Sequence, residues 1–232
     1  MSRRLTVVQL LPALAAGGVE RGTLEIARAL VAAGHRSVVI SAGGKLVAPL
    51  LAEGSEHIEL GIGHKSLWSL RHVPTLRRLF ARLGADVVHA RSRFPAWLAW
   101  FAWRSMDRAT RPRFVTTMHG LNSVNAYSGI MARGERVICV SQTVREHILC
   151  HYPKTDPQRL RVIPRAVDPA EFPHGHRPAG DWRKQFCIEY PALSGAAPWL
   201  CLAGRGTRMK GHGHAIRLLA DLREAGVDAR LI

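Results

Sequence analysis

The residues best suited to chemistry lie in a glycine-rich turn, where Arg205 and Lys210 are interspersed with Gly204, Gly206 and Gly211. An apolar run precedes the turn and a helical pattern follows it, which predicts a turn at the carboxyl end of a strand. In open α/β sheets, phosphate-bearing ligands bind there, close to the positive end of the next helix. An arginine can hold a phosphate with two N–H groups, and a lysine adds a compact charge. We predict phosphate binding by Arg205 and Lys210, the alternative being a solvated basic loop.

A second candidate is the glycine pair Gly17-Gly18, between the first predicted strand and the first predicted helix. Without side chains, backbone N–H groups at this helix start could approach a diphosphate closely. The pair does not match the Gly-x-Gly-x-x-Gly fingerprint of dinucleotide sites, so a simple tight turn is the alternative.

His119 is the candidate catalytic residue, because it follows directly on the predicted strand 114–118. A histidine at the carboxyl end of a central strand faces the ligand crevice. It could donate a hydrogen bond to a ligand hydroxyl or phosphate, or act as an acid or a base. A structural role is the alternative, and we interpret the other eleven histidines as structural or solvated.

Basic and aromatic residues alternate between positions 64 and 104. One interpretation is two helices packed on a sheet, with their arginines in solvent. The other is a surface that binds anionic lipid headgroups. The predicted apolar stripes are Leu67, Leu70, Leu76, Leu79, Phe80 and Leu83, flanked by Arg71, Arg77, Arg78 and Arg82, and then Trp97, Trp100 and Trp103.

Predicted strands and helices that alternate along the chain must position these residues. Several of the strands are continuous apolar runs, which is typical of a parallel sheet covered by helices on both faces. Gly34 suits the end of the first helix and Ser141 the start of a later one. The predicted strands are 5–11, 37–41, 57–60, 86–89, 114–118, 137–140 and 161–164, and the predicted helices are 20–33, 45–52, 67–83, 95–106 and one opening at Ser141.

Proline-rich segments at 152–157 and 164–178 mark a predicted domain boundary. We therefore predict a Rossmann-like first domain over 1–165 and the start of a second over 166–232. The second would hold a helix at 181–190, a strand at 198–203, a helix at 212–225 and a strand from Val227, which is too little to close a core.

The net charge is +16, from 33 Lys and Arg against 17 Asp and Glu. This favours anionic partners, namely nucleotide phosphates, an anionic lipid surface or a nucleic acid, although no nucleic-acid reader motif is present. Four cysteines without paired spacing indicate reduced thiols in a cytoplasmic protein. The N-terminal apolar run continues into a good helix, so we interpret it as a first strand and not as a signal peptide.

Five segments in this order resemble family 4 retaining glycosyltransferases of the GT-B fold, and the likeness runs from Leu5 to Ile232. The segments are Gly17-Gly18-Val19-Glu20-Arg21-Gly22-Thr23, Thr116-Thr117-Met118-His119-Gly120, Val137-Ile138-Cys139-Val140-Ser141, Arg161-Val162-Ile163-Pro164-Arg165-Ala166-Val167-Asp168 and Gly204-Arg205-Gly206-Thr207-Arg208-Met209-Lys210-Gly211.

The resemblance implies two Rossmann-like domains, an acceptor-side domain over 1–165 and a donor domain that starts at 166, with a nucleotide-diphosphate sugar as donor. Gly17, Gly18, Arg205 and Lys210 would then bind the donor diphosphate, and His119 would lie near the transferred sugar. The resemblance further implies transfer of a hexosyl-type sugar without a metal. The acceptor would be a glycan or lipid-linked acceptor of the lipopolysaccharide or cell-surface polysaccharide type. The enzyme would be cytoplasmic, with a peripheral position at the inner membrane as one option, and would have no nucleic acid as partner.

Two departures from the family pattern affect these expectations. Ala166 stands where the family usually has a glycine, and the family's Glu-x7-Glu motif would lie beyond Ile232. The sequence is therefore expected to be a truncated and impaired transferase. The alternative is a non-catalytic remnant that binds the acceptor or an anionic membrane surface.

Overall fold

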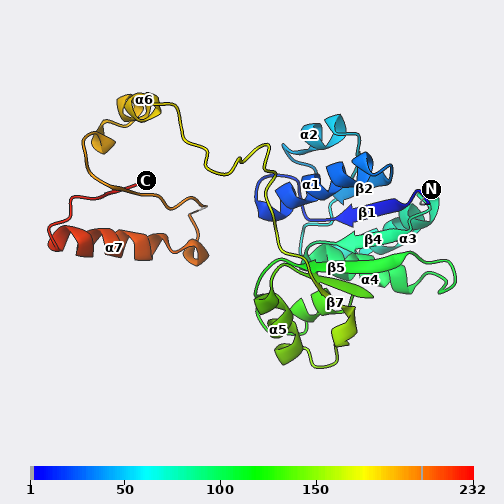
Figure 1. Cartoon of the computed structure of the whole chain (residues 1–232). Coiled ribbons are helices and arrows are strands. Elements are labelled where there is room, and N and C mark those ends of the chain that lie inside the picture. The colour runs from blue at the N-terminus through cyan, green and yellow to red at the C-terminus, as the bar shows by residue number, and fades with distance from the viewer. Residues whose placement is uncertain (1–2, 205) are drawn as a thin grey trace. The chain divides into compact units, whose positions relative to one another are not determined.

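The computed structural model describes residues 3–204 and 206–232 (Figure 1). The chain divides into two compact units, 1–166 and 167–232. The first contains a seven-stranded sheet and the second a two-stranded one. Assignment of 1–165 to an acceptor-side domain and of 166–232 to a donor domain stays a prediction, because compactness does not identify a ligand.

All seven strands of the first unit run parallel, in the order β3-β2-β1-β4-β5-β6-β7. This confirms the predicted α/β class. The reason is visible in Val38, Val39 and Ile40, which are consecutive and completely buried, as a strand covered on both faces requires. The strands are β1 (Thr6–Leu10), β2 (Arg36–Ser41), β3 (Glu56–Glu59), β4 (Val87–Ala90), β5 (Arg113–Met118), β6 (Arg136–Cys139) and β7 (Leu160–Val162).

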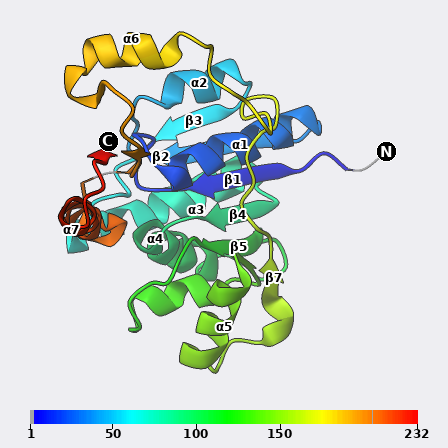
Figure 2. The same ribbon diagram turned by 60° about the vertical axis from the view of Figure 1, so that its left-hand side comes forward.

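Helices cover both faces of this sheet (Figure 1, Figure 2). Leu24 and Leu50, from α1 and α2, pack with Val39 in one core layer. Phe80 and Leu98, from α3 and α4, belong to the other layer, which is also the larger. The helices are α1 (Gly18–Ala32), α2 (Val47–Ala52), α3 (His72–Arg82), α4 (Arg93–Arg104) and α5 (Gln142–His151), with 3-10 turns η1 (Leu67–Arg71), η2 (Ser128–Ala132) and η3 (Pro157–Arg159).

The predicted helix ends are confirmed at two positions. Gly34 follows the end of α1 with a φ of 79°, the left-handed conformation that favours glycine. The Ser141 hydroxyl accepts a hydrogen bond of 3.2 Å from the Val144 N–H and so caps α5.

The prediction of one helix over 67–83 is wrong in its first part. Residues 67–71 form the 3-10 turn η1, and α3 begins only at His72. A 3-10 turn has three residues per turn, so its side chains do not continue the face of the following α-helix. Leu76 and Phe80 are buried as expected, whereas Leu67 is 84% exposed and Leu70 45% exposed.

The tryptophans of α4 belong to the fold. The Trp103 N–H donates to the Pro112 carbonyl at 2.7 Å, and the Trp97 N–H donates to the Tyr127 carbonyl at 2.9 Å. Trp103 is buried against Phe114 of the sheet. The packing interpretation therefore holds for this stripe.

The second unit contains one parallel β–α–β arrangement. Trp199 and Leu200 pair with Arg230 and Leu231, so the predicted strand 198–203 is shorter than expected. Among the described residues no helix is both long and apolar enough to cross a membrane. The elements are α6 (Trp182–Glu189), η4 (Pro191–Leu193), β8 (Trp199–Leu200), η5 (Arg208–Lys210), α7 (His212–Glu224) and β9 (Arg230–Leu231).

Candidate functional site

The carboxyl ends of the central strands form one edge of the sheet. Leu10 at the end of β1 pairs with Ala90 at the end of β4, and Ala90 pairs with Thr116 of β5. Residues that follow these strands therefore emerge side by side. Arg91 follows β4 and His119 follows β5. This edge is where an open α/β sheet binds ligands.

Gly17 and Gly18 lie above the same edge, at the start of α1. Gly17 precedes the helix with a φ of 141°, a conformation that L side chains rarely adopt. A Cβ on Gly17 would lie 2.7 Å from the Glu20 carboxylate, and one on Gly18 would lie 2.7 Å from Nη1 of Arg165. Gly17 therefore needs glycine for its backbone conformation, whereas the glycine at position 18 leaves the space that the end of the Arg165 side chain occupies.

Arg165 reaches this helix start from the opposite end of the unit. It follows β7, and the chain there runs back past the strands toward α1 (Figure 2). Its Nη2 donates a hydrogen bond to the Gly18 carbonyl, 147 positions earlier in the sequence. Arg165 was not among the site residues predicted from the sequence. Its place shortly after the last strand of a parallel sheet was the available signal.

Arg91 is a second cation that the sequence-based prediction missed. The side chain is 6% exposed, and its Nη1 donates to Oε1 of Gln9 at 3.2 Å. Its Nε is buried without a hydrogen-bond partner among the described residues. Burial, followed by the charge of Arg165, lowers the Arg91 pKa to about 10, while Glu25 opposes the shift.

His119 lies within the field of these two arginines. Burial lowers its pKa to about 3, and the charges of Arg91 and Arg165 contribute further. Both ring nitrogens are buried and without a hydrogen-bond partner in the described part of the chain. The imidazole is therefore neutral at physiological pH and has one N–H to donate and one nitrogen that can accept.

His89 shows what a structural histidine looks like in the same sheet. Burial lowers its pKa to about 3 as well, but its Nε2 lies 2.7 Å from the Thr117 hydroxyl, to which it is hydrogen-bonded. The contrast separates a histidine satisfied by the fold from one whose ring nitrogens have no hydrogen-bond partner among the described residues.

The remaining predicted residues lie in the second unit. Lys210 is exposed at the end of η5, and its side-chain carbons would lie 3.3 Å from a Cβ on Gly204. Arg205 lies outside the described residues. Within the first unit Arg165 links Gly18 with His119, since it bonds to one and acts electrostatically on the other. The site assignments themselves stay predictions.

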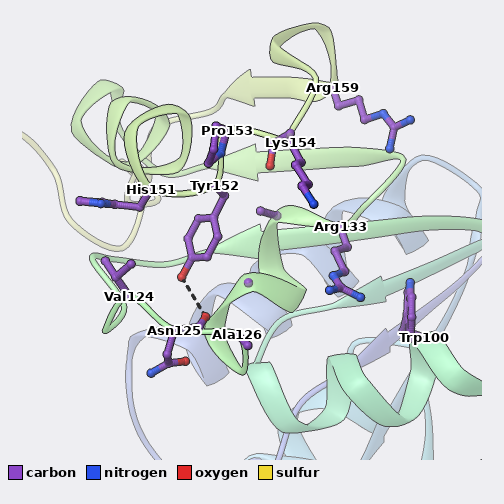
Figure 3. A pocket seen from close by; sticks show the side chains of 13 residues that line it. Trp100, Val124, Asn125, Ala126, Arg133, His151, Tyr152, Pro153, Lys154 and Arg159 are labelled. Atoms are coloured by element: carbon purple, nitrogen blue, oxygen red, sulfur yellow. Dashed lines mark hydrogen bonds between the residues drawn. The ribbon is translucent and has the colours of Figure 1, made fainter.

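A cavity of about 700 Å³ lies elsewhere in the first unit (Figure 3). Its wall combines aromatic and basic side chains, and it includes none of the predicted site residues. Arg133 stacks over the Trp100 ring at 5.1 Å, and the Tyr152 hydroxyl donates to the Asn125 carbonyl at 3.5 Å. The lining residues are Trp100, Val124, Asn125, Ala126, Gly129, Ala132, Arg133, His151, Tyr152, Pro153, Lys154, Thr155 and Arg159.

The family model described as Glycosyltransferase Family 4 matches residues 16–171. A subunit of human phosphatidylinositol N-acetylglucosaminyltransferase is 26% identical over 174 residues, which are 67% of this chain and 35% of the human protein. This chain thus spans about a third of that relative.

The similar solved structures include further glycosyltransferases. A glycosyltransferase from Rickettsia africae ESF-5 is 33% identical with a TM-score of 0.76, over 96% of this chain and 59% of that one. WaaG, a glycosyltransferase involved in lipopolysaccharide biosynthesis, has a TM-score of 0.70 at 16% identity, over 97% and 62%. Anabaena HepE, solved with UDP and glucose, has a TM-score of 0.60 at 14% identity, over 99% and 69%. The last two show the fold alone, which is that of GT-B glycosyltransferases.

Proposed function

The chain belongs to glycosyltransferase family 4, and from this membership we propose that it transfers a sugar from a nucleotide-diphosphate sugar to an acceptor. The family match carries the proposal, because a fold by itself supports many functions. The match spans residues 16–171 and includes Gly17, Gly18, Arg91, His119 and Arg165.

The donor diphosphate is held by Gly17, Gly18, Arg205 and Lys210 in this proposal. Transfer breaks the bond between the anomeric carbon and the diphosphate oxygen, so negative charge grows on the leaving diphosphate. Fixed cations stabilise that charge in the transition state, and no metal is then required. The UDP found with HepE supports a nucleotide donor.

His119 contributes hydrogen bonds and not proton abstraction. With a pKa of about 3, its imidazole is a weak base at neutral pH. Each of its unpartnered ring nitrogens can make one hydrogen bond, the protonated one to a sugar oxygen and the other from a sugar hydroxyl. We assign it to the orientation of the transferred sugar.

The acceptor in this proposal is a glycan or a lipid-linked glycan of the lipopolysaccharide or cell-surface polysaccharide type. The new bond joins the anomeric carbon to an acceptor oxygen, whose proton leaves with the nucleoside diphosphate. The transferred sugar is a hexose that retains its anomeric configuration. The role of WaaG in lipopolysaccharide synthesis, and the phosphatidylinositol in the name of the human relative, support an acceptor of this class.

We place the enzyme in the cytoplasm, peripheral to the inner membrane. Leu67 is 84% exposed and Trp68 79% exposed at η1, with the cations Lys65 and Arg71 on either side. Exposed apolar side chains next to cations suit an anionic lipid surface, into which the apolar groups insert while the charges meet headgroups.

The test is a glycosyl-transfer assay with the 232-residue chain, a panel of UDP, GDP and ADP sugars, and membrane lipid extract as acceptor. We expect release of the nucleoside diphosphate in the presence of EDTA, with the anomeric configuration of the product retained in its NMR spectrum. Absence of turnover with all donors would refute transfer by this chain and favour a non-catalytic role in binding the acceptor or the membrane.

A further inference from the structure

Two arginine side chains converge on one point of α1. A Cβ on Gly22 would lie 3.2 Å from Nη2 of Arg91 and 3.2 Å from Nη2 of Arg165. The two guanidinium groups come from the segments after β4 and after β7, which are not neighbouring strands, and the segment after β7 brings Arg165 back to the first helix. Gly22 leaves the space that both of them enter.

This convergence is electrostatically unfavourable in the protein alone. The charge of Arg165 lowers the pKa of Arg91, which burial has already lowered. Glu25 opposes the shift, and its Oε2 would lie 3.8 Å from the same Cβ. One exposed carboxylate thus faces two guanidinium groups, and one positive charge remains in excess.

One N–H donor of this arginine pair, Nε of Arg91, makes no hydrogen bond within the described residues. Arg91 is 6% exposed, yet its Nε has no hydrogen-bond partner among the described residues. A buried donor without a partner is unfavourable, and a charged one more so. The unpartnered ring of His119 lies within the field of the same two charges. An oxyanion would satisfy both arginines at once, since a guanidinium binds phosphate or carboxylate oxygens in pairs.

The start of α1 adds to this preference. Gly18 and Gly22 lie in the first turns of a 15-residue helix, whose N-terminal N–H groups and dipole attract anions. Glu20 folds back over Gly17, while the two arginines occupy the side of Gly18 and Gly22. The two sides of the helix start are therefore chemically different.

We propose that Arg91 and Arg165 form a phosphate-binding subsite beside Gly18 and Gly22, within the first unit. The choice of ligand rests on the proposed function, because two substrates could supply the phosphate. One is the donor nucleoside diphosphate, and the other is an acceptor that bears a phosphate near its reacting hydroxyl. The subsite is additional to the predicted cations Arg205 and Lys210.

The first arm measures binding of pyrophosphate to the full chain by calorimetry at 50 mM and 150 mM salt. Arg165→Ala removes an exposed side chain, and Arg91→Lys keeps the buried charge but loses the planar fork. We expect each to weaken binding about tenfold or more, as for a lost charge-assisted hydrogen bond. Arg136→Ala removes an exposed arginine at the opposite edge of the sheet and should change binding less than twofold.

The second arm distinguishes the sources by competition. If UDP, GDP or ADP displaces pyrophosphate and loses affinity in Arg165→Ala, the phosphate belongs to the donor. If hexose phosphates bind together with the nucleotide, and only they lose affinity, the phosphate belongs to the acceptor. In both cases the pKa of His119, followed by NMR of its labelled ring, should rise on binding, because an anion offsets the two arginines.

Equal pyrophosphate affinity in all variants, or no binding of pyrophosphate by the wild type even at 50 mM salt, would overturn the subsite. Those results leave the proposed function to be decided by its own assay. Conversely, suppose that the wild type binds pyrophosphate and Arg165→Ala fails to bind it, while the wild type shows no transferase turnover. That combination would support the subsite and refute the enzymatic proposal.

Discussion

The side chain of Arg165 donates a hydrogen bond to the Gly18 carbonyl, so the segment after the last strand is held at the start of the first helix. A Cβ on Gly18 would lie 2.7 Å from Nη1 of the same arginine. The glycine therefore serves as a docking position for a guanidinium group as well as a helix start. This hydrogen bond joins the segment that follows β7, the last strand of the first unit, to the start of α1, its first helix.

Gly18→Ala should displace Arg165 and weaken pyrophosphate binding about tenfold, while stability changes little because the displaced group is the end of a flexible side chain. Calorimetry and thermal unfolding measure the two effects. Gly180→Ala is the matched control, since a Cβ there meets nothing within 4 Å. A variant that binds as well as the control would show that Arg165 does not need this position.

Gly134→Ala should destabilise the protein by about 1–3 kcal/mol through overpacking. Its Cβ would clash with the backbone carbonyl oxygen of Arg136 and would lie 2.8 Å from the Thr116 hydroxyl, and backbone cannot move aside as a side chain can. Urea unfolding of this variant and of Gly180→Ala measures the difference. Equal midpoints would contradict the close packing at this turn.

Lys210→Ala should reduce turnover about 10²–10³-fold if the lysine stabilises charge on the leaving diphosphate. Lys184→Ala, an exposed lysine of α6, is the control for the lost charge and should retain activity. Steady-state kinetics with the active donor give the comparison. Similar loss in both variants would point to net charge in place of a specific contact.

Stability should fall as the pH decreases from about 6.5 toward 3, because burial lowers the pKa of His119 and of His89 to about 3 in the folded state. The unfolded chain binds these protons first, so each histidine costs up to about 1.4 kcal/mol per pH unit within this window. Above pH 6.5 both histidines are neutral in the folded and in the unfolded chain, so they no longer lower the free energy of unfolding.

His119→Asn should show a shallower pH dependence of the free energy of unfolding than the wild type. Carboxylates titrate equally in both proteins, so the difference in slope reports the histidine. Urea titrations at pH 7, 6, 5 and 4 measure it, and identical slopes would contradict a neutral, buried imidazole.

Leu67→Ser combined with Trp68→Ser should weaken binding to phosphatidylglycerol vesicles at least about tenfold without affecting stability, since both side chains are largely exposed. Vesicle co-sedimentation at two salt concentrations measures this. Ile188→Ser is the control, because Ile188 is 79% exposed in the second unit. If the double variant binds vesicles as well as the wild type does, η1 is not part of the membrane-binding surface.

Local patterns predicted most of the fold of the first unit. Continuous apolar runs such as Val38 to Ile40 indicated buried parallel strands, and Gly34 and Ser141 indicated helix ends. The failure over 67–83 has a local cause. Apolar spacing there fitted an α-helix, but a 3-10 turn exposes Leu67 and Leu70.

The sequence by itself determined the alternation of strands and helices, the glycine turns, the histidine that follows β5 and the resemblance that proved to be a family membership. Only the tertiary structure decided that Arg91 and Arg165 meet over Gly22 and that the ring of His119 lacks a partner among the described residues. The physical reason is that hydrophobic periodicity depends on near neighbours in the chain. The convergence of charges depends instead on the path of the folded chain. Strand β4 lies next to β1, whereas β7 lies at the edge of the sheet, and the segment after β7 returns to the first helix.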